Sequence, residues 1–270
     1  MRIGLITSTP GHPLLAATTA LLTPGHQVVH LDPETATAPT GPLADVHLLK
    51  ARTPRALELA AALERHGAPV VNTAAATALC QDRTAMADLA LRAGLPFAPT
   101  RTFPTLAGLA AGPPPAGPVV VKSRHSRRHD LVALVDSAAR LRELAASAPG
   151  EPVVVQDFAP SSGDDHKLWV VGDHIFAALR RSELSPGGQG PSRPLPEGGL
   201  PPGWAGLVRR VGEVFALDVY GVDVLDTGDG TPLIVDINAF PGVRGQTGAP
   251  EALAALALSR AGGKGTSPRT

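Results

Sequence analysis

The stretch GVDV at 221–224 and the later stretch VDINAFPG at 235–242 decide the fold of this chain. In both, apolar and polar residues alternate, as they do in a half-buried β-strand. Asp236 and Asn238 share one face because side chains two residues apart on a strand point the same way. If the polar break between the stretches is a hairpin turn, Asp223 approaches the same place. Two carboxylates and an amide oxygen are suitable ligands for a Mg²⁺ ion that also holds a nucleotide's phosphates. The alternative interpretation is that these side chains form a plain polar face at the end of a hairpin.

Composition excludes several functional classes. The chain has 270 residues, one cysteine and a formal net charge of zero. A neutral chain exerts no general attraction on nucleic acid or an anionic membrane, and one cysteine excludes an internal disulfide. No apolar run approaches the roughly 20 residues that span a bilayer. Residues 1–7 indicate a first strand, since Gly11 and Pro13 would interrupt a signal peptide. We therefore expect a cytoplasmic protein that binds neither nucleic acid nor membrane.

Strands and helices alternate in the first part of the chain. Strands are expected at 2–7, 27–31, 45–49 and 70–71, and helices at 13–22 and 53–66. Thr53 caps the second helix and Pro54 occupies its first turn. This alternation predicts a small parallel sheet in an N-terminal α/β domain over residues 1–80. The segment lacks a Gly-x-Gly-x-x-Gly loop, so its layout alone does not indicate a dinucleotide.

The remainder of the chain predicts two mixed α/β units, a central one at 81–150 and a C-terminal one at 151–260. Helices are expected at 82–94, 137–148, 204–215 and 251–259, and strands at 100–103, 119–122, 131–135, 153–158, 167–171 and 174–179. The Pro- and Gly-rich segments 110–118 and 182–203 predict a hinge and a mobile loop. Residues 261–270 are expected to form a disordered tail.

Residues that carry chemistry follow one another in a recognisable order. They are Arg83 at a helix start, Lys122 at a strand end, Gln156-Asp157-Phe158, Asp165, Lys167, Arg181, Asp223, Asp236 and Asn238. In this order the chain resembles the ATP-grasp superfamily, most of all its glutamate-ligase branch of the ribosomal-protein-modification type. A second likeness, through KLWVVG at 167–172 and DINAFPG at 236–242, is to the inositol polyphosphate kinases of the same fold. The resemblance covers about residues 70–245 and implies a Rossmann-like sheet followed by two α+β subdomains that clasp a nucleotide.

The resemblance also implies how the nucleotide is bound. Lys122 and Arg83 would lie on the phosphates and offset their charge. The segment 156–158 would read adenine through its backbone, and Asp165 would contact the ribose. The alternative for Lys122 is a solvated strand end, and for Asp165 a plain loop aspartate.

Catalytic and metal-binding roles are implied in the same way. Lys167 and Arg181, on successive strands, would stabilise the charge that develops as the γ-phosphate is transferred. Asp223, Asp236 and Asn238 would hold one or two Mg²⁺ ions, for which Mn²⁺ can substitute. Aspartate at position 236 is the kinase-like choice, since the ligases commonly have glutamate there.

Three segments depart from the ligase pattern. The stretch 123–130 contains no glycine, although the family's phosphate loop is normally glycine-rich. Its three arginines and two histidines at 124–129 fit a phosphorylated or carboxylate-rich substrate, or else a solvated basic loop. Arg83 stands where a lysine is usual, and the loop 187–192 lacks an asparagine that the ligases often place there.

Three functions therefore stay open. The first is an ATP-dependent ligase that joins a carboxylate-bearing small molecule or peptide to an amine donor through an acyl phosphate. The second is a kinase that phosphorylates a polyanionic small molecule, and the third is a nucleotide-binding protein without turnover. The resemblance leaves the acceptor, the amine and homo-oligomer formation undetermined.

Overall fold

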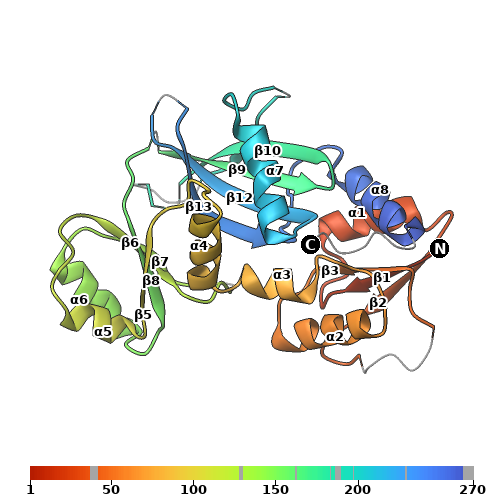
Figure 1. The fold of residues 1–270 in the computed structure, drawn as a ribbon, viewed down its shortest axis with the longest axis horizontal. Helices are drawn as coiled ribbons and strands as arrows, with labels where there is room; N and C mark the ends of the chain where they lie inside the picture. The colour runs from red at the N-terminus through yellow and green to blue at the C-terminus, as the bar shows by residue number, and fades with distance from the viewer. Residues whose placement is uncertain are drawn as a thin grey trace.

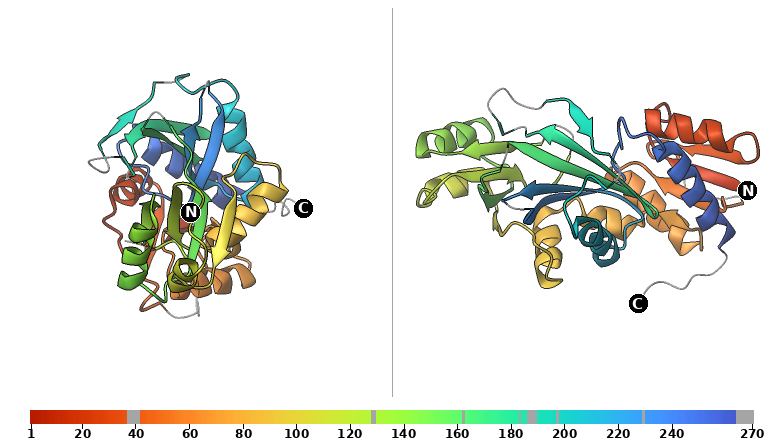
Figure 2. Two further views of the ribbon diagram at one scale, coloured as in Figure 1. Left: turned by 90° about the vertical axis from the view of Figure 1, so that its left-hand side faces the viewer. Right: turned by 90° about the horizontal axis from the view of Figure 1, so that it is seen from above.

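Three β-sheets follow one another along an elongated molecule (Figures 1 and 2). The computed structural model describes residues 1–36, 42–127, 130–161, 163–182, 184–185, 190–196, 198–228 and 230–263. Within these ranges the structure has the mixed α/β class that the sequence predicts. No helix in the described ranges has the length and apolar character needed to cross a membrane.

The N-terminal sheet is parallel, with the strand order β2-β1-β3-β4. Its elements are β1 (Arg2–Ile6), α1 (Pro13–Leu22), β2 (Gln27–Leu31), β3 (Val46–Leu49), α2 (Pro54–Arg65) and β4 (Val70–Val71), followed by the short helix α3 (Ala74–Leu79). As predicted, the Thr53 hydroxyl accepts a hydrogen bond from the Ala56 amide (3.2 Å) and so caps α2. The sequence analysis missed only α3 in this part of the chain.

The second sheet is antiparallel and has the order β5-β8-β6-β7. It contains β5 (Thr100–Phe103), β6 (Val119–Ser123), β7 (Val132–Val135) and β8 (Val153–Asp157). Two helices, α5 (Leu106–Ala111) and α6 (Ala138–Ser147), pack on one of its faces through a separate core cluster. The helix α5 was not predicted, and its last residues lie in the segment 110–118 that we expected to be a hinge.

The third sheet is also antiparallel, with the order β11-β10-β9-β12-β13. Its strands are β9 (Asp164–Val171), β10 (His174–Arg181), β11 (Ser192–Pro194), β12 (Val219–Asp226) and β13 (Pro232–Ala239). Two helices, α4 (Arg83–Arg92) and α7 (Trp204–Phe215), cover one face, whereas α8 (Ala249–Gly262) packs beside α1 (Figure 1). Because α8 extends to Gly262, the first two residues of the expected tail are helical. Residues 264–270, and part of the expected mobile loop 182–203, lie outside the described residues.

Alternation along the strands leaves the other face of this sheet for polar chemistry. On β12, Val222 and Val224 enter the core beneath α7, and so does Leu168 on β9. Asp223, between the two valines, and Lys167, just before Leu168, therefore point to the opposite face, where they are paired in the ladder. This polar face meets the second sheet, and the arrangement positions the site described below.

One buried amide ties the N-terminal sheet to the strand that carries Asp223. Asn72, 2 % exposed, donates through Nδ2 to the carbonyl of Val219 (2.6 Å). Its Oδ1 accepts from the amides of Asp218 (2.8 Å) and Val219 (3.0 Å). Three hydrogen bonds therefore join the end of β4 to the beginning of β12.

The Asn72→Ala substitution is expected to destabilise the fold by about 2–4 kcal/mol, because it leaves buried backbone groups unpaired. Urea denaturation measures the change. The control is Thr73→Ala, which removes a hydroxyl that caps α3 by accepting from Ala76 N (3.1 Å) and should cost about 1 kcal/mol. Equal losses in the two variants would contradict the bridging role of Asn72.

Candidate active site

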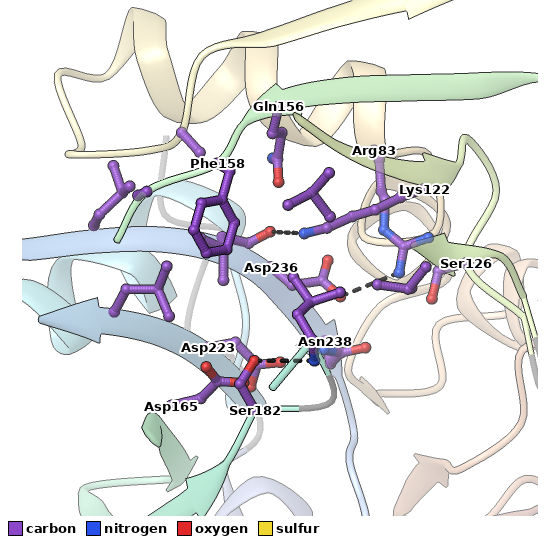
Figure 3. Close-up of a pocket in the computed structure, with 18 of the residues that line it drawn as sticks. Arg83, Lys122, Ser126, Gln156, Phe158, Asp165, Ser182, Asp223, Asp236 and Asn238 are labelled. Carbon is purple, nitrogen blue, oxygen red and sulfur yellow. Dashed lines mark hydrogen bonds and ion pairs between the residues drawn. The ribbon is translucent and has the colours of Figure 1, made fainter. Parts of the chain in front are cut away.

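A cavity of about 540 Å³ lies where the second sheet meets the polar face of the third. All but one of the predicted site residues line it: Arg83, Lys122, Gln156, Asp157, Phe158, Asp165, Lys167, Asp223, Asp236 and Asn238. They come from α4, from strands in two sheets and, for Phe158, from the position after β8, and Figure 3 labels most of them around Asp236. Segments up to 155 residues apart are thus brought together by the fold, as the distance from 83 to 238 in the chain shows.

The predicted metal ligands lie side by side on β12 and β13. Asp223 is directly opposite Asp236 in the antiparallel ladder, and Asn238 is opposite Gly221, so the three polar side chains share one face. A β-bulge follows the Asp223–Asp236 pair and leaves Val235 without a partner residue on β12. Its carbonyl is then free to accept a hydrogen bond from outside the sheet.

Lys122 makes this hydrogen bond from the facing sheet. Its Nζ donates to the carbonyl of Val235 (2.9 Å), and the residue is only 6 % exposed (Figure 3). Burial lowers the pKa of Lys122, and the nearby carboxylate of Asp236 partly opposes this effect. The buried ammonium of Lys122 is thus not fully compensated by negative charge. An anion that binds beside it would supply the missing counter-charge.

Arg83 links both sides of the cavity. Its guanidinium contacts Asp130 (2.6 Å) and Asp236 (3.3 Å) and also donates to the carbonyl of Ser123 (2.8 Å). Burial lowers the pKa of Arg83, but Asp236 and Asp130 outweigh it and raise the pKa above its ordinary value. Burial would likewise raise the pKa of Asp236, yet Arg83 and Lys122 bring it below its ordinary value. Asp236 is therefore ionised at neutral pH.

The donor set fits a divalent cation. Oδ1 of Asp236 is buried and has no hydrogen-bond partner among the described residues, and the same is true of Oδ1 of Asp165. Within the described ranges, no three or more His, Cys, Asp or Glu side chains are grouped so that they alone could hold a metal ion. Mg²⁺ commonly binds through one or two carboxylates and takes its other ligands from water and substrate phosphates. Asp223, Asp236 and the amide of Asn238 match this requirement.

Lys167 lies on the same face and pairs with two carboxylates. Its Nζ is 2.6 Å from Oδ2 of Asp223 and 3.6 Å from Oδ2 of Asp165. Both Lys167 and Asp165 are buried, so the pair lies in a medium where charges interact strongly. The structure thus brings the residue expected at the γ-phosphate next to a predicted metal ligand.

The segment expected to bind adenine lies at the cavity wall. Gln156 is buried and donates through Nε2 to the hydroxyl of Thr100 (3.1 Å), whereas Phe158 is 37 % exposed and presents its ring to the cavity (Figure 3). The amide of Phe158 donates to the carbonyl of Pro118 (3.0 Å). The side chain of Asp157 is 79 % exposed and pairs with Arg101. Backbone reading of adenine by this segment stays a prediction.

Arg181 is the one predicted site residue that the structure does not bring to the cavity. In the β9–β10 ladder it pairs with Asp164, whereas its neighbour Arg180 pairs with Asp165. Directly paired residues point the same way, so Arg180 shares the face of Lys167 and Arg181 lies on the other. The ladder therefore places Arg181 on the strand, as expected, but on the face opposite Lys167, and a catalytic role for Arg181 stays a prediction.

The basic segment at 124–129 is largely paired within the protein. Arg124 forms a two-pronged contact with Asp82 (3.0 and 2.7 Å), and Arg127 forms another with Glu151 (2.7 and 2.8 Å). Arg128 and His129 lie outside the described residues. Carboxylates of the chain itself thus compensate two of the three arginines, which weakens the case that they bind a polyanionic substrate.

Further polar residues line the cavity and were missed by sequence reasoning, among them Arg52, Asp130, Ser161 and Ser182. Asp130 could have been inferred, because it closes the basic segment opposite Arg83. Arg52 lies in the loop between β3 and α2, and no spacing connects it with the other residues. Only the packing of the N-terminal sheet against the third sheet places it there.

Comparison with known proteins supports this picture. No protein-family model matches the chain. A probable α-L-glutamate ligase from Rhodopirellula baltica is 34% identical over 102 residues, which are 34% of this chain and 24% of the relative. A second, from Nitrosococcus oceani, is 29% identical over 47% of this chain and 44% of the relative. The chain thus matches less than half the length of these curated relatives.

Solved structures match over nearly the whole chain. The crystal structure of an ATP-grasp protein with a RimK domain from Sphaerobacter thermophilus has a TM-score of 0.73 and 25% identity, covering 96% of this chain and 100% of the other. A D-alanine–D-alanine ligase from Bacillus anthracis has a TM-score of 0.70 and 15% identity, with 97% of each chain covered.

Proposed function

Because the chain has the ATP-grasp fold and its sequence relatives are probable glutamate ligases, we propose that it is an ATP-dependent carboxylate–amine ligase. One observation carries the proposal. Asp223, Asp236 and Asn238 lie together on one sheet face, with Lys167 beside them and Lys122 reaching them from the facing sheet. This is the charge arrangement that a triphosphate with its metal ion requires.

The residues divide the binding of Mg-ATP between them. We place adenine beside Phe158 and the ribose near Asp165. Lys122 would replace its contact with Val235 by one to the phosphates, which compensates its buried charge. One or two Mg²⁺ ions, held by Asp223, Asp236 and Asn238, would supply charge neutralisation at the β- and γ-phosphates.

The proposed reaction has two steps. A carboxylate oxygen of the acceptor attacks the γ-phosphorus, the bond from that phosphorus to the bridging oxygen breaks, and ADP leaves. The nitrogen of the amine donor then attacks the acyl carbon, phosphate departs with its oxygen, and the nitrogen loses a proton to solvent. Lys167 stabilises the negative charge on the transferring group in the first step, and the site mainly positions the reactants.

Product analysis tests this function. Purified protein with Mg-ATP and pools of amino acids, peptides and phosphorylated polyols is expected to release ADP and phosphate and to form an amide. Chelation of Mg²⁺ by EDTA should reduce ADP release at least about a hundredfold, because the phosphates lose their counter-charge. ADP with a phosphomonoester in place of an amide would indicate a kinase, and tight ATP binding without ADP from any pool would indicate a protein without turnover.

A further inference from the structure

A second group of basic side chains lies around Arg52, which lines the cavity, and the roles above do not use it. It consists of His12 before α1, Lys50 and Arg52 after β3, and Arg244 after β13. Lys50 is near enough to Arg52 and Arg244 to feel their charges, and His12 is near enough to Lys50 and Arg244. The pKa of Lys50 is lowered to about 8 by burial and then by Arg52 and Arg244. Burial lowers the pKa of His12, and Lys50 and Arg244 lower it further.

The group is held by a loop that is fixed in place. Phe240 and Val243 have positive φ values of 44° and 42°, which side chains of these types rarely adopt. Both are buried in the core shared with β1 and α1, so packing against the N-terminal sheet keeps the loop in this shape. Gly242 between them lies against Arg244 and His12, since a Cβ atom there would be 3.4 Å from each. The Lys50 ammonium lies 5.8 Å from the centre of the Phe240 ring.

The cations of this group lack compensation. Among the described residues, no carboxylate lies within 4 Å of Lys50, Arg52 or Arg244, unlike Arg124 and Arg127. The buried Nδ1 of His12 also has no hydrogen-bond partner there. The three positive charges of Lys50, Arg52 and Arg244 repel one another on this preformed surface. Binding of an anion between them would therefore stabilise the folded protein.

The group adjoins the reacting end of the proposed ATP site. Arg52 lines the cavity together with Asn238, and Phe240 is the first residue after β13, two residues beyond Asn238. Adenine is placed beside Phe158, and Figure 3 shows Asn238 on the other side of Asp236, so we infer that the acceptor carboxylate enters beside Asn238. An anion held by the group would therefore lie beyond the γ-phosphate, on the acceptor's side.

Resting on the proposed function, we propose that His12, Lys50, Arg52 and Arg244 form the acceptor subsite, and that the acceptor carries a second anionic group besides the carboxylate that is activated. The guanidinium groups of Arg52 and Arg244 and the ammonium of Lys50 provide more positive charge and more hydrogen-bond donors than one carboxylate can use. A dicarboxylate or an acidic peptide satisfies them. An acceptor without a second anionic group would leave these cations without a counter-charge, as they are in the free protein.

Calorimetric titration of the full chain with Mg-ADP present tests the subsite. The probes are glutarate, a dianion, and butyrate, a monoanion of similar size, at matched ionic strength. Wild-type protein is expected to bind glutarate at least tenfold more tightly than butyrate. Arg244→Gln is expected to weaken glutarate binding at least tenfold and to leave the ADP affinity within twofold.

Two further variants make the test specific. Lys50→Met should weaken glutarate binding as Arg244→Gln does. Arg55→Gln removes an arginine three residues after Arg52 whose side chain is 59 % exposed, and it should bind glutarate as wild type does. Equal affinity for the two probes, or full glutarate affinity in Arg244→Gln, overturns the subsite while normal ADP binding leaves the proposed function standing. Failure of the wild-type protein to bind ADP overturns the proposed function instead.

Discussion

The Asp236→Asn variant is expected to lose about a thousandfold or more of its ADP release while it remains folded. Asparagine has the shape of aspartate but not its charge, so the metal ion loses a ligand that no neighbour can replace. Asp236 also faces Asp223 across the ladder, and the substitution halves the carboxylate charge of that pair. Steady-state rates with Mg-ATP measure the loss.

The same variant should also be less stable, because Asp236 compensates the buried charges of Arg83 and Lys122. Removing one partner of a buried ion pair costs about 3 kcal/mol. The pKa of Asp236 is lower in the folded protein than in the unfolded chain, so its stabilisation is present above about pH 4 and is lost as pH falls through the folded pKa. The stability difference between wild type and variant should therefore be full at pH 7 and shrink below about pH 4.

Asp173→Asn is the matched control, since it makes the same chemical change at an exposed turn. Its ADP release and its urea midpoint should equal those of wild type. Turnover retained by Asp236→Asn would remove the metal assignment, whatever the stability result.

The Lys122→Met variant is expected to bind ATP about a hundredfold more weakly, yet its free energy of unfolding should not fall. Lys122 is buried, and burial lowers its pKa, so the folded protein holds this charge at a cost that methionine avoids. The folded pKa lies below the unfolded value of about 10.4, so this cost is fully present at neutral pH and disappears as pH rises toward 10. Loss of function with unchanged stability is the mark of a group kept for its ligand.

Urea denaturation at pH 7 and calorimetric titration with a non-hydrolysable ATP analogue measure the two properties of Lys122→Met separately. Lys122→Arg serves as the comparison, because it keeps the charge and changes only its reach and geometry. Its analogue affinity should lie between those of wild type and Lys122→Met. A large loss of stability in Lys122→Met would show that the lysine supports the fold instead of the nucleotide.

Local periodicity determined the parts of the site that lie on single elements. The alternation of GVDV and VDINAFPG was enough to predict a hairpin with Asp223, Asp236 and Asn238 on one face, and the ladder confirms this geometry. The N-terminal sheet was predictable for the same reason, since its strands and helices are separated by clear caps and turns. Such patterns depend on neighbours a few residues apart, which any reader of the chain can see.

Register and charge pairing could not be predicted in this way. A shift of one residue exchanges Arg180 and Arg181 between faces, and only the observed pairing of β9 with β10 decides which one faces Lys167. The basic segment looked like an anion site because its partners, Asp82 and Glu151, are distant in the sequence.

The sequence by itself determined the fold class and the polar face on the β12–β13 hairpin, because both follow from short-range periodicity along the backbone. Only the tertiary structure decided how Lys122 reaches the bulge at Val235, that Arg52 lines the same cavity, and that Arg52 and Arg244 come together around Lys50. These groups come from different sheets and are placed by the packing of whole layers, for which no sequence spacing provides a signal.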